Sequence, residues 1–283
     1  MPPQDFTNLV GGVKFDRPVD EAFPPVSYSA AGKWHAGLPR RFFAVLGGKQ
    51  YQDDAGSCTA HGYPKVVESW AKKIGADFQV CRQDAYFGAR FLEGNGAERR
   101  DGGAYPSYVR RWYREHGTVG EERKKYRPAD VTTWRPPADW KDDRALLSHG
   151  YDPIPRTADA ALFEMGSNGL PTAICHLVTD SINRVTAEGL ERFVDGPVLG
   201  GHCRAAVGYD LDLFIGGAVT PSILVANSWR GFGIPHPLFA TDSRFDDEPD
   251  SFSWMPLASF ENPRFLQDND RLAQPPAIKA VTA

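Results

Sequence analysis

Cysteine and histidine are the side chains best suited to nucleophilic catalysis, and this chain of 283 residues has four cysteines and seven histidines. Cys58 differs from the other cysteines because Gly56-Ser57 precedes it and a predicted helix follows it. At a helix N-terminus the helix dipole lowers the pKa of a thiol, and unpaired backbone N–H groups can stabilise an oxyanion. We therefore expect Cys58 to be a nucleophile.

A thiolate needs a base that takes its proton and a third group that orients the base. His202 follows Gly200-Gly201 and begins a short apolar run, which places it at the mouth of a predicted strand. Asn227 ends another apolar run, and its amide oxygen could accept a hydrogen bond from the histidine, shielded from water by Trp229. Cys58, His202 and Asn227 thus match the three roles of nucleophile, base and orienting group.

Metal binding is the competing interpretation of these residue types. No two cysteines have the Cys-x-x-Cys spacing of structural zinc sites. Cys203 lies beside His202, but adjacent side chains of a strand point to opposite faces, so we do not expect them to bind one metal ion. We expect no metal and no organic cofactor. Cys81 and Cys175 are interpreted as buried thiols, and the sequence leaves open whether any of these cysteines pair.

Taken together, these segments resemble the papain-like cysteine peptidases, in particular their bacterial branch. Gln52 lies six residues before Cys58, as the oxyanion-hole glutamine does in that family, and His202 follows Cys58 by 144 residues. Asn227-Ser228-Trp229 matches the segment that carries the family's catalytic asparagine, and Ser253-Trp254-Met255-Pro256 is similar to the closing strand of bacterial members. The resemblance covers about residues 45–260.

The resemblance implies a cysteine endopeptidase that hydrolyses peptide bonds through a thioester acyl-enzyme. Cys58, His202 and Asn227 would form its catalytic triad, and Gln52 would contribute to the oxyanion hole. The substrate, a peptide or protein, would be bound by Gly102, Gly103, Tyr105, Gly201 and Trp229. Two alternatives stay open: an acyl-transfer enzyme (a transpeptidase, cyclase or amide-forming transferase) and a catalytically silent member that only binds peptides.

The sequence also departs from the family's pattern. Thr59 replaces the aromatic residue that usually follows the nucleophile, and Pro64 falls inside the expected central helix, where it would remove one hydrogen bond and kink the helix. Arg204 interrupts an otherwise apolar strand. Ala104 leaves the register of the Gly102-Gly103 wall uncertain by one residue. None of these changes removes a catalytic group, so they bear on substrate preference.

Apolar periodicity predicts helices from about residue 64, over 83–93, 106–116 and 159–168, and strands over 171–177, 203–209 and 223–227. A helix-rich first half and a strand-rich second half favour an α+β protein. The resemblance makes this a papain-like fold with a helical lobe, an antiparallel β-barrel-like lobe and an active-site cleft between them. We expect an extended arm over 1–45, a catalytic domain over 46–262, divided near residue 145, and a loosely packed tail over 263–283.

Composition excludes several classes of protein. The net charge is −4, which argues against a nucleic-acid binder, and no apolar run approaches the roughly 18 residues of a membrane span. The first residues lack a secretory signal, so we expect a cytoplasmic protein without a membrane partner; the oligomeric state is open. Residues 1–45 are too short and proline-rich for a long helical propeptide. We therefore expect either that the enzyme is synthesised in an active form or that residues 1–45 form a strap along the second lobe.

Overall fold

The computed structural model describes residues 12–15, 37–47, 51–146, 149–179, 185–191, 198–235, 251–260 and 265–275. Its α-helices are α1 (Thr59–Lys73), α2 (Arg82–Glu93), α3 (Pro106–Glu115), α4 (Trp140–Leu146), α5 (Ala158–Phe163) and α6 (Leu257–Phe260). Short 3-10 helices cover Ala97–Arg99 and Pro128–Asp130, and a π-helical turn covers Glu164–Asn168. The strands are β1 (Arg41–Phe43), β2 (Gly150–Pro153), β3 (Thr172–Thr179), β4 (Val198–Asp210), β5 (Phe214–Ile215), β6 (Ala218–Val219), β7 (Ser222–Ala226), β8 (Phe252–Pro256) and β9 (Leu266–Gln274).

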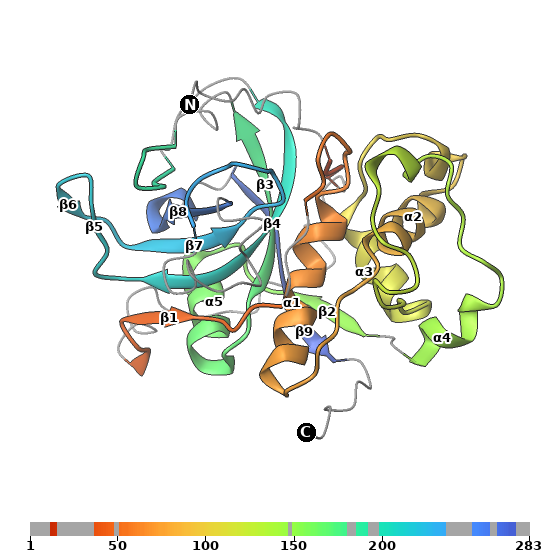
Figure 1. Ribbon diagram of the computed structural model, residues 1–283. Coiled ribbons are helices and arrows are strands. Elements are labelled where there is room, and N and C mark those ends of the chain that lie inside the picture. Colours follow the sequence, from red (N-terminus) through yellow and green to blue (C-terminus); the bar gives the residue numbers. More distant parts are fainter. Residues whose placement is uncertain are drawn as a thin grey trace.

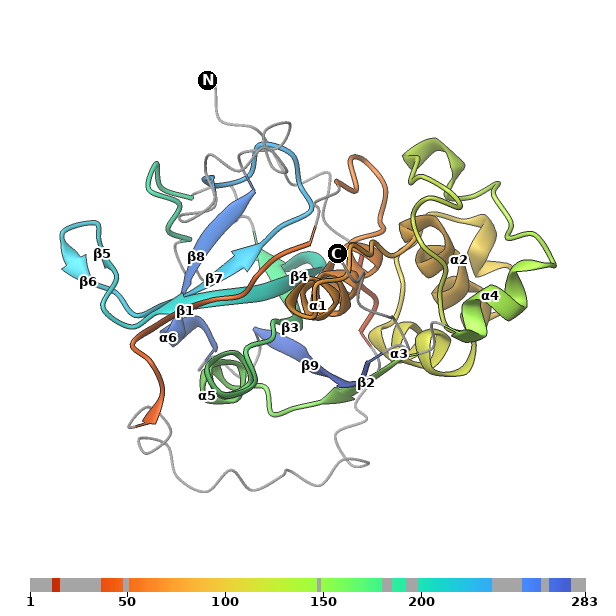
Figure 2. The same ribbon diagram turned by 60° about the horizontal axis from the view of Figure 1, so that its bottom comes forward.

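Helices and sheet occupy two lobes, and α1 runs between them. Figures 1 and 2 show α2, α3 and α4 on one side of α1 and most of the sheet on the other. The apolar faces of α1, α2 and α3 share one core, to which Val66, Tyr86 and Trp112 belong. Because α1 contributes to this core and also packs on the sheet, its position fixes the helical lobe relative to the β lobe.

The central helix begins earlier than its apolar periodicity predicts, at the place that the setting of Cys58 indicates. It starts at Thr59, directly after Cys58, and contains Pro64 as an internal residue. Pro64 is the sixth residue of the helix, beyond the first four N–H groups that lack intrahelical partners, so its ring removes the bond that a backbone N–H would make to the Ala60 carbonyl. Lys72 and Lys73 lie in the last turn, where positive charge is favourable.

A buried ion pair joins α1 to α2. Glu68 and Arg82 have fully buried side chains and form a two-pronged contact, in which Arg82 Nη2 lies 2.7 Å from Glu68 Oε2. The backbone N–H of Val80 donates to Glu68 Oε1 at 2.8 Å. Removing one partner of such a pair typically costs about 3–5 kcal/mol, because the other charge stays buried without compensation.

The main sheet is antiparallel and open. Its strand order is β2-β9-β3-β4-β7-β8, and β1 also pairs with β4. The long strand β4 thus pairs with three strands, while β5 and β6 form a separate hairpin. This arrangement confirms the predicted α+β, two-lobed fold, although the described strands do not close into a barrel.

The C-terminal region corrects a prediction. We expected a loosely packed tail from residue 263, but β9 lies inside the sheet, between β2 and β3. Its buried polar residues explain why apolar periodicity did not reveal it. Asn269 donates to the Pro155 carbonyl at 3.0 Å, and Asp270 accepts from Arg110 at 2.9 Å and from the hydroxyl of Tyr63. The β lobe therefore extends beyond residue 262.

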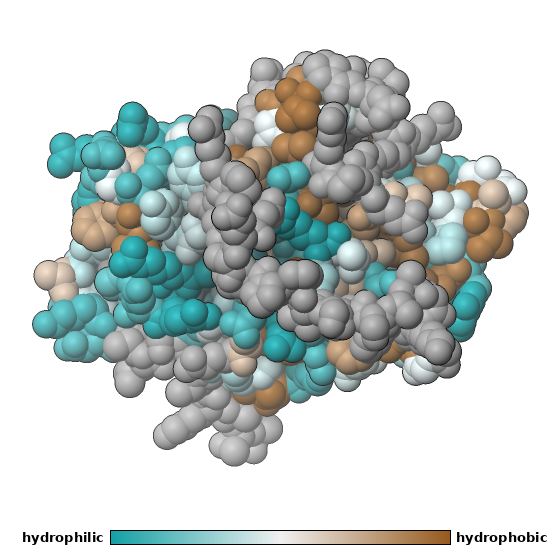
Figure 3. Space-filling model, turned by 180° about the vertical axis from the view of Figure 1, so that it is seen from behind, coloured by the Kyte–Doolittle hydropathy of each residue, from teal (hydrophilic) through white to brown (hydrophobic). Residues whose placement is uncertain are grey.

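Figure 3 shows the rear of the molecule, with hydrophilic residues over much of the helical lobe and smaller apolar patches on the β lobe. Among the described exposed residues, the large apolar ones include Phe214 and Val219, on the β5–β6 hairpin. Within the part of the chain that the structure describes, none of the helices has the length and hydropathy needed to cross a membrane.

Candidate active site

The loop before α1 is attached to the segment after β7 through Gln52. The backbone N–H of Gln52 donates to the Ser228 carbonyl at 3.0 Å, and the Ser228 hydroxyl donates to Gln52 Oε1 at 2.5 Å. Gln52 Nε2 donates to the Ala55 carbonyl at 2.7 Å. Because Oε1 accepts from a hydroxyl, the amide is fixed with its nitrogen toward the loop, and one of its two N–H groups remains for another acceptor.

Two further contacts hold this loop in the helical lobe. The Ser57 hydroxyl lies 2.6 Å from the Tyr126 hydroxyl, which in turn donates to the Gln52 carbonyl at 3.1 Å. The Asp101 carboxylate accepts from the Gly56 N–H at 3.0 Å and from the Tyr86 hydroxyl at 2.5 Å. These bonds restrain the turn that presents the start of α1.

The hydrogen bonds of Asn227 determine the tautomer of His202. Asn227 Oδ1 lies 2.7 Å from His202 Nε2 and also accepts the Ser228 N–H at 2.7 Å. An oxygen at this position can only accept, so Nε2 carries the proton and Nδ1 is left with a free lone pair. Trp229 stacks on the imidazole with ring centroids 4.0 Å apart and an interplanar angle of 21°. Both His202 and Trp229 are fully buried.

The Cys58 thiol lies against the backbone of Cys203, the residue that follows His202. The thiol is fully buried, and burial raises its pKa, although a hydrogen bond from the Cys203 backbone acts in the opposite direction. We expected the helix dipole to lower this pKa; desolvation outweighs it in this covered state. Among the described residues, no hydrogen bond joins the Cys58 thiol to the His202 ring.

The imidazole of His202 is neutral in this environment. Burial is the first cause that lowers its pKa to about 3, and the positive charge of Arg204 is the second, while the hydrogen bond with Asn227 raises it. Arg204 is buried on the same strand and donates to His176 Nε2 at 2.8 Å and to Glu191 Oε2 at 3.0 Å. The charge that interrupts the apolar strand is therefore paired inside the protein.

Residues 12–15 of the N-terminal arm lie in the cleft between the lobes. Val13 pairs with Ala104 in a parallel bridge: the Lys14 N–H donates to the Ala104 carbonyl at 3.1 Å, and the Ala104 N–H donates to the Gly12 carbonyl at 3.0 Å. Val13 is buried in the core cluster that also contains Cys58. These four residues run between the lobes, whereas Arg41–Phe43 of the same arm pair with β4 and so lie along the second lobe, as the expected strap would.

The arm passes very close to the candidate nucleophile. A Cβ atom on Gly12 would lie 2.6 Å from Cys58 Sγ and 2.7 Å from the Gly56 carbonyl oxygen, so only glycine fits there. On the other wall, a Cβ atom on Gly201 would lie 2.5 Å from the Phe15 ring and 2.9 Å from the Val13 carbonyl oxygen. Residues 12–15 therefore fill the space between Cys58 on one wall and Gly201 on the other.

The backbone that pairs with the arm lies one residue after the Gly102-Gly103 pair that we expected to bind substrate. Ala104, not Gly102 or Gly103, makes the backbone hydrogen bonds to the arm. The N–H of Gly103 donates instead to the Tyr86 hydroxyl at 3.1 Å. Tyr105 lies beside the arm, with the Lys14 ammonium 5.5 Å from its ring centroid. The sequence left this register open, and only the pairing partner of Ala104 resolves it.

Several solved protease structures superimpose on the fold of this chain. Xylellain, a cysteine protease from Xylella fastidiosa, superimposes with a TM-score of 0.73 at 17% identity, over 96% of this chain and 97% of its own. Procathepsin B S9 from Trypanosoma congolense gives 0.62 at 17% identity, over 97% of this chain and 88% of its own. Procathepsin L 3 from the larval midgut of Tenebrio molitor gives 0.63 at 17% identity, over 95% and 78%.

The fold is that of the papain-like cysteine proteases. At 17% identity the likeness extends to the fold, and the activity of this chain is a separate question. No model of a protein family and no curated protein matches the sequence. In this papain-like fold the cleft between the lobes brings Gln52, Cys58, His202 and Asn227 together from segments far apart in the chain.

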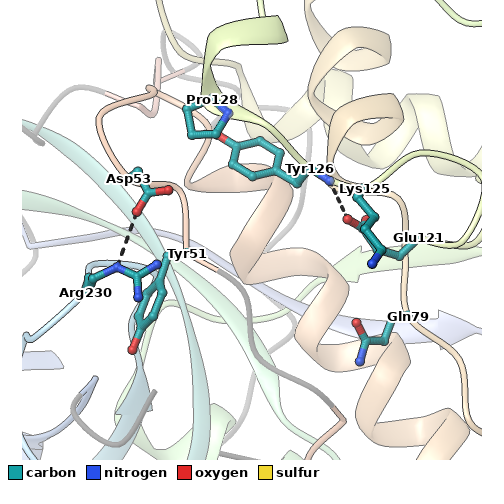
Figure 4. A pocket seen from close by; sticks show the side chains of 8 residues that line it. All are labelled: Tyr51, Asp53, Gln79, Glu121, Lys125, Tyr126, Pro128 and Arg230. Atoms are coloured by element: carbon teal, nitrogen blue, oxygen red, sulfur yellow. Dashed lines mark hydrogen bonds and ion pairs between the residues drawn. The ribbon is translucent and has the colours of Figure 1, made fainter. Parts of the chain in front are cut away.

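A pocket of about 390 Å³ lies beside the Gln52 loop. Figure 4 shows Arg230 near Asp53 and Tyr51, and the Tyr126 backbone against Glu121. Arg230 Nε lies 3.6 Å from Asp53 Oδ1, and its guanidinium carbon lies 4.2 Å from the Tyr51 ring centroid. These contacts support the loop on its outer side, and sequence inspection did not identify them. The lining residues are Tyr51, Asp53, Gln79, Glu121, Lys125, Tyr126, Pro128 and Arg230.

Proposed function

We propose that this chain is a cysteine peptidase that hydrolyses peptide bonds, with Cys58 as its nucleophile. The observation that carries the proposal is the orientation of His202: its Nε2–H is bound by Asn227, so Nδ1 is the basic nitrogen, and the next residue contacts the Cys58 thiol. A base with a fixed tautomer next to a thiol at a helix start is what nucleophilic acyl transfer requires.

In this mechanism the Cys58 thiol passes its proton to His202 Nδ1 and the sulfur attacks the substrate carbonyl carbon. The negative charge that develops on oxygen is stabilised by the free N–H of Gln52 Nε2 and by the backbone N–H of Cys58. His202 then returns the proton to the leaving amine, and the C–N bond breaks. Water, deprotonated by the same nitrogen, attacks the thioester and releases the acid and the thiol. Asn227 and Trp229 keep the imidazole oriented throughout.

We also infer that residues 12–15 hold the cleft closed in the resting protein. The Gly12 carbonyl is bonded to Ala104, so it is not presented to the oxyanion donors, and the arm is bound without being cut. The covered thiol and imidazole are both neutral, as their shifted pKa values indicate. Departure of the arm would return water to the cleft and remove part of the desolvation that opposes the thiolate.

Substitution of Cys58 tests the peptidase. We expect Cys58→Ala to lower kcat on a mixed peptide pool by at least about 10³-fold, because the covalent step is lost while the cleft remains. Hydrolysis is followed by mass spectrometry of the products, with and without an added amine acceptor. Cys81→Ala is the matched control, since Cys81 is also a buried thiol directly before a helix. Cleavage that persists in Cys58→Ala contradicts the proposal, and products joined to the amine would indicate acyl transfer instead.

A further inference from the structure

The side chain of Lys14 binds at a negatively charged site on the helical wall of the cleft. Its ammonium lies 2.6 and 2.8 Å from the two carboxylate oxygens of Glu93 and 5.5 Å from the centroid of the Tyr105 ring. The Lys14 and Glu93 side chains are 27% and 20% exposed, so the contact is partly shielded from water. Two independent features, a carboxylate and an aromatic face, thus favour a cation at one place.

Glu93 does not stabilise α2, the helix to which it belongs. It is the last residue of α2, where the helix dipole is negative and a carboxylate is unfavourable. In the part of the chain that the structure describes, its only ionic or hydrogen-bonded side-chain partner is Lys14. The nearby Asp101, by contrast, is engaged by the Gly56 N–H and the Tyr86 hydroxyl. When the arm leaves, Glu93 is therefore the carboxylate that loses its partner.

We propose that Glu93 and Tyr105 form a substrate subsite for a lysine or arginine side chain, which Lys14 fills in the resting protein. This inference rests on the peptidase function proposed above. The backbone of Ala104 is the edge on which the arm lies, and a peptide substrate that replaces the arm meets the same edge. Along the arm, Val13 points into the core and Lys14 toward Glu93, so one side chain of a bound strand reaches this site.

The position of the subsite relative to the nucleophile follows from the arm. Gly12 lies over Cys58, and Lys14 is two residues further along. We therefore expect the basic side chain about two residues from the substrate residue that lies against Cys58 Sγ. A partly exposed ion pair with a cation–π contact corresponds to about a fivefold preference.

Matched peptides test the subsite in the full-length protein. A peptide that the protein cleaves is synthesised with lysine, norleucine or glutamate at each position on both sides of the scissile bond. We expect kcat/KM to be about fivefold higher for lysine than for norleucine at one position. In Glu93→Gln this ratio should fall to about one, and in Glu93→Lys the glutamate peptide should become the better substrate. Ratios are compared because a weaker hold on Lys14 raises the activity on all peptides alike.

Glu98→Gln is the matched control, since Glu98 is a carboxylate of the same lobe that faces Arg99 and Arg135. Its lysine-to-norleucine ratio should stay at the wild-type value. A ratio of one in the wild type, or an unchanged ratio in Glu93→Gln, would show that Glu93 only anchors the arm.

Binding measurements separate this inference from the peptidase proposal. If no peptide is hydrolysed, the peptidase proposal fails, and affinities of the lysine and norleucine peptides for full-length Cys58→Ala protein still decide the subsite. Equal affinities overturn it. A lysine preference that Glu93→Gln removes supports it.

Discussion

Hydrogen bonds from the Ser228 and Trp229 backbone N–H groups fix Asn227 Oδ1 as the acceptor for His202, and this determines where His202 carries its proton. Asn227→Ala removes the acceptor, so the imidazole can rotate or adopt the other tautomer. We expect kcat to fall by about 10²-fold or more, with a smaller change in KM, because the loss affects the proton transfers. Steady-state kinetics check this.

Circular dichroism and the urea midpoint of Asn227→Ala serve as the control for folding. An unchanged kcat in a folded Asn227→Ala protein would contradict the assigned role.

Single residues were predictable where a chemical role demands a residue type. Cys58, His202 and Asn227 were expected from residue type and setting, and Gln52 from the resemblance to the papain-like family. The structure places the four around one cleft, and their roles are proposals. Ala104 and Glu93 were not expected, because a backbone edge and an isolated carboxylate carry no signal in one sequence. The predicted direction of the Cys58 pKa shift was also wrong, since burial of the thiol, against which Gly12 packs, raises the pKa and cannot be read from one sequence.

At the scale of elements, the contact between α1 and β4 sets the distance between the two halves of the site. Gly62 permits it: a Cβ atom there would lie 2.7 Å from Cys203 Sγ and 3.2 Å from the Arg204 backbone nitrogen. Gly62→Ala should cost about 1–3 kcal/mol of unfolding free energy through overpacking. It should also lower kcat, because it moves Cys58 away from His202.

Urea unfolding and peptide hydrolysis measure both effects of Gly62→Ala. Gly37→Ala is the control, since a Cβ atom at Gly37 has no neighbour within 4 Å. If Gly62→Ala left both stability and kcat unaltered, the helix–strand contact would not position the site.

Elements with regular apolar periodicity were predicted within a few residues, as α2 and β7 illustrate. The strand β9 was missed because its central residues are polar, and their burial is compensated by partners such as Arg110 that lie far away in sequence. Apolar periodicity placed the start of α1 too late, near Pro64, although the setting of Cys58 indicated a helix start directly after it. In each case a distant partner or a tolerated exception overrode the local pattern.

At the scale of the whole molecule, we propose that residues 12–15 control access to the cleft in which they lie. Gly12→Ala places a methyl group against Cys58 Sγ and the Gly56 carbonyl, so the arm can no longer lie there. We expect peptidase activity at low substrate concentration to rise several-fold, because the internal competitor is weakened.

Gly37→Ala again provides the comparison for Gly12→Ala, and proteolytic sensitivity of the arm gives a second readout. Lower activity in Gly12→Ala, with the arm unchanged, would show that the arm supports the active structure and does not inhibit it.

The two-lobed architecture was predictable because a known family shares the order of its motifs. The place of the arm was not, because residues 12–15 bind through backbone pairing and a glycine contact that leave no periodicity. Its proline-rich composition suggested only an extended segment.

Covalent labelling tests the central claim most directly. The full-length protein and the Gly12→Ala variant are incubated with a thiol-directed peptidyl epoxide, and the modified residue is identified by mass spectrometry. The account predicts one adduct, on Cys58, formed faster in Gly12→Ala, with loss of hydrolysis in proportion to labelling. All four cysteines are buried, but it is Cys58 that Gly12 of the arm covers and that departure of the arm uncovers, so the other three should stay unmodified. Labelling of another cysteine that abolishes activity, or full activity after Cys58 is modified, would contradict the account.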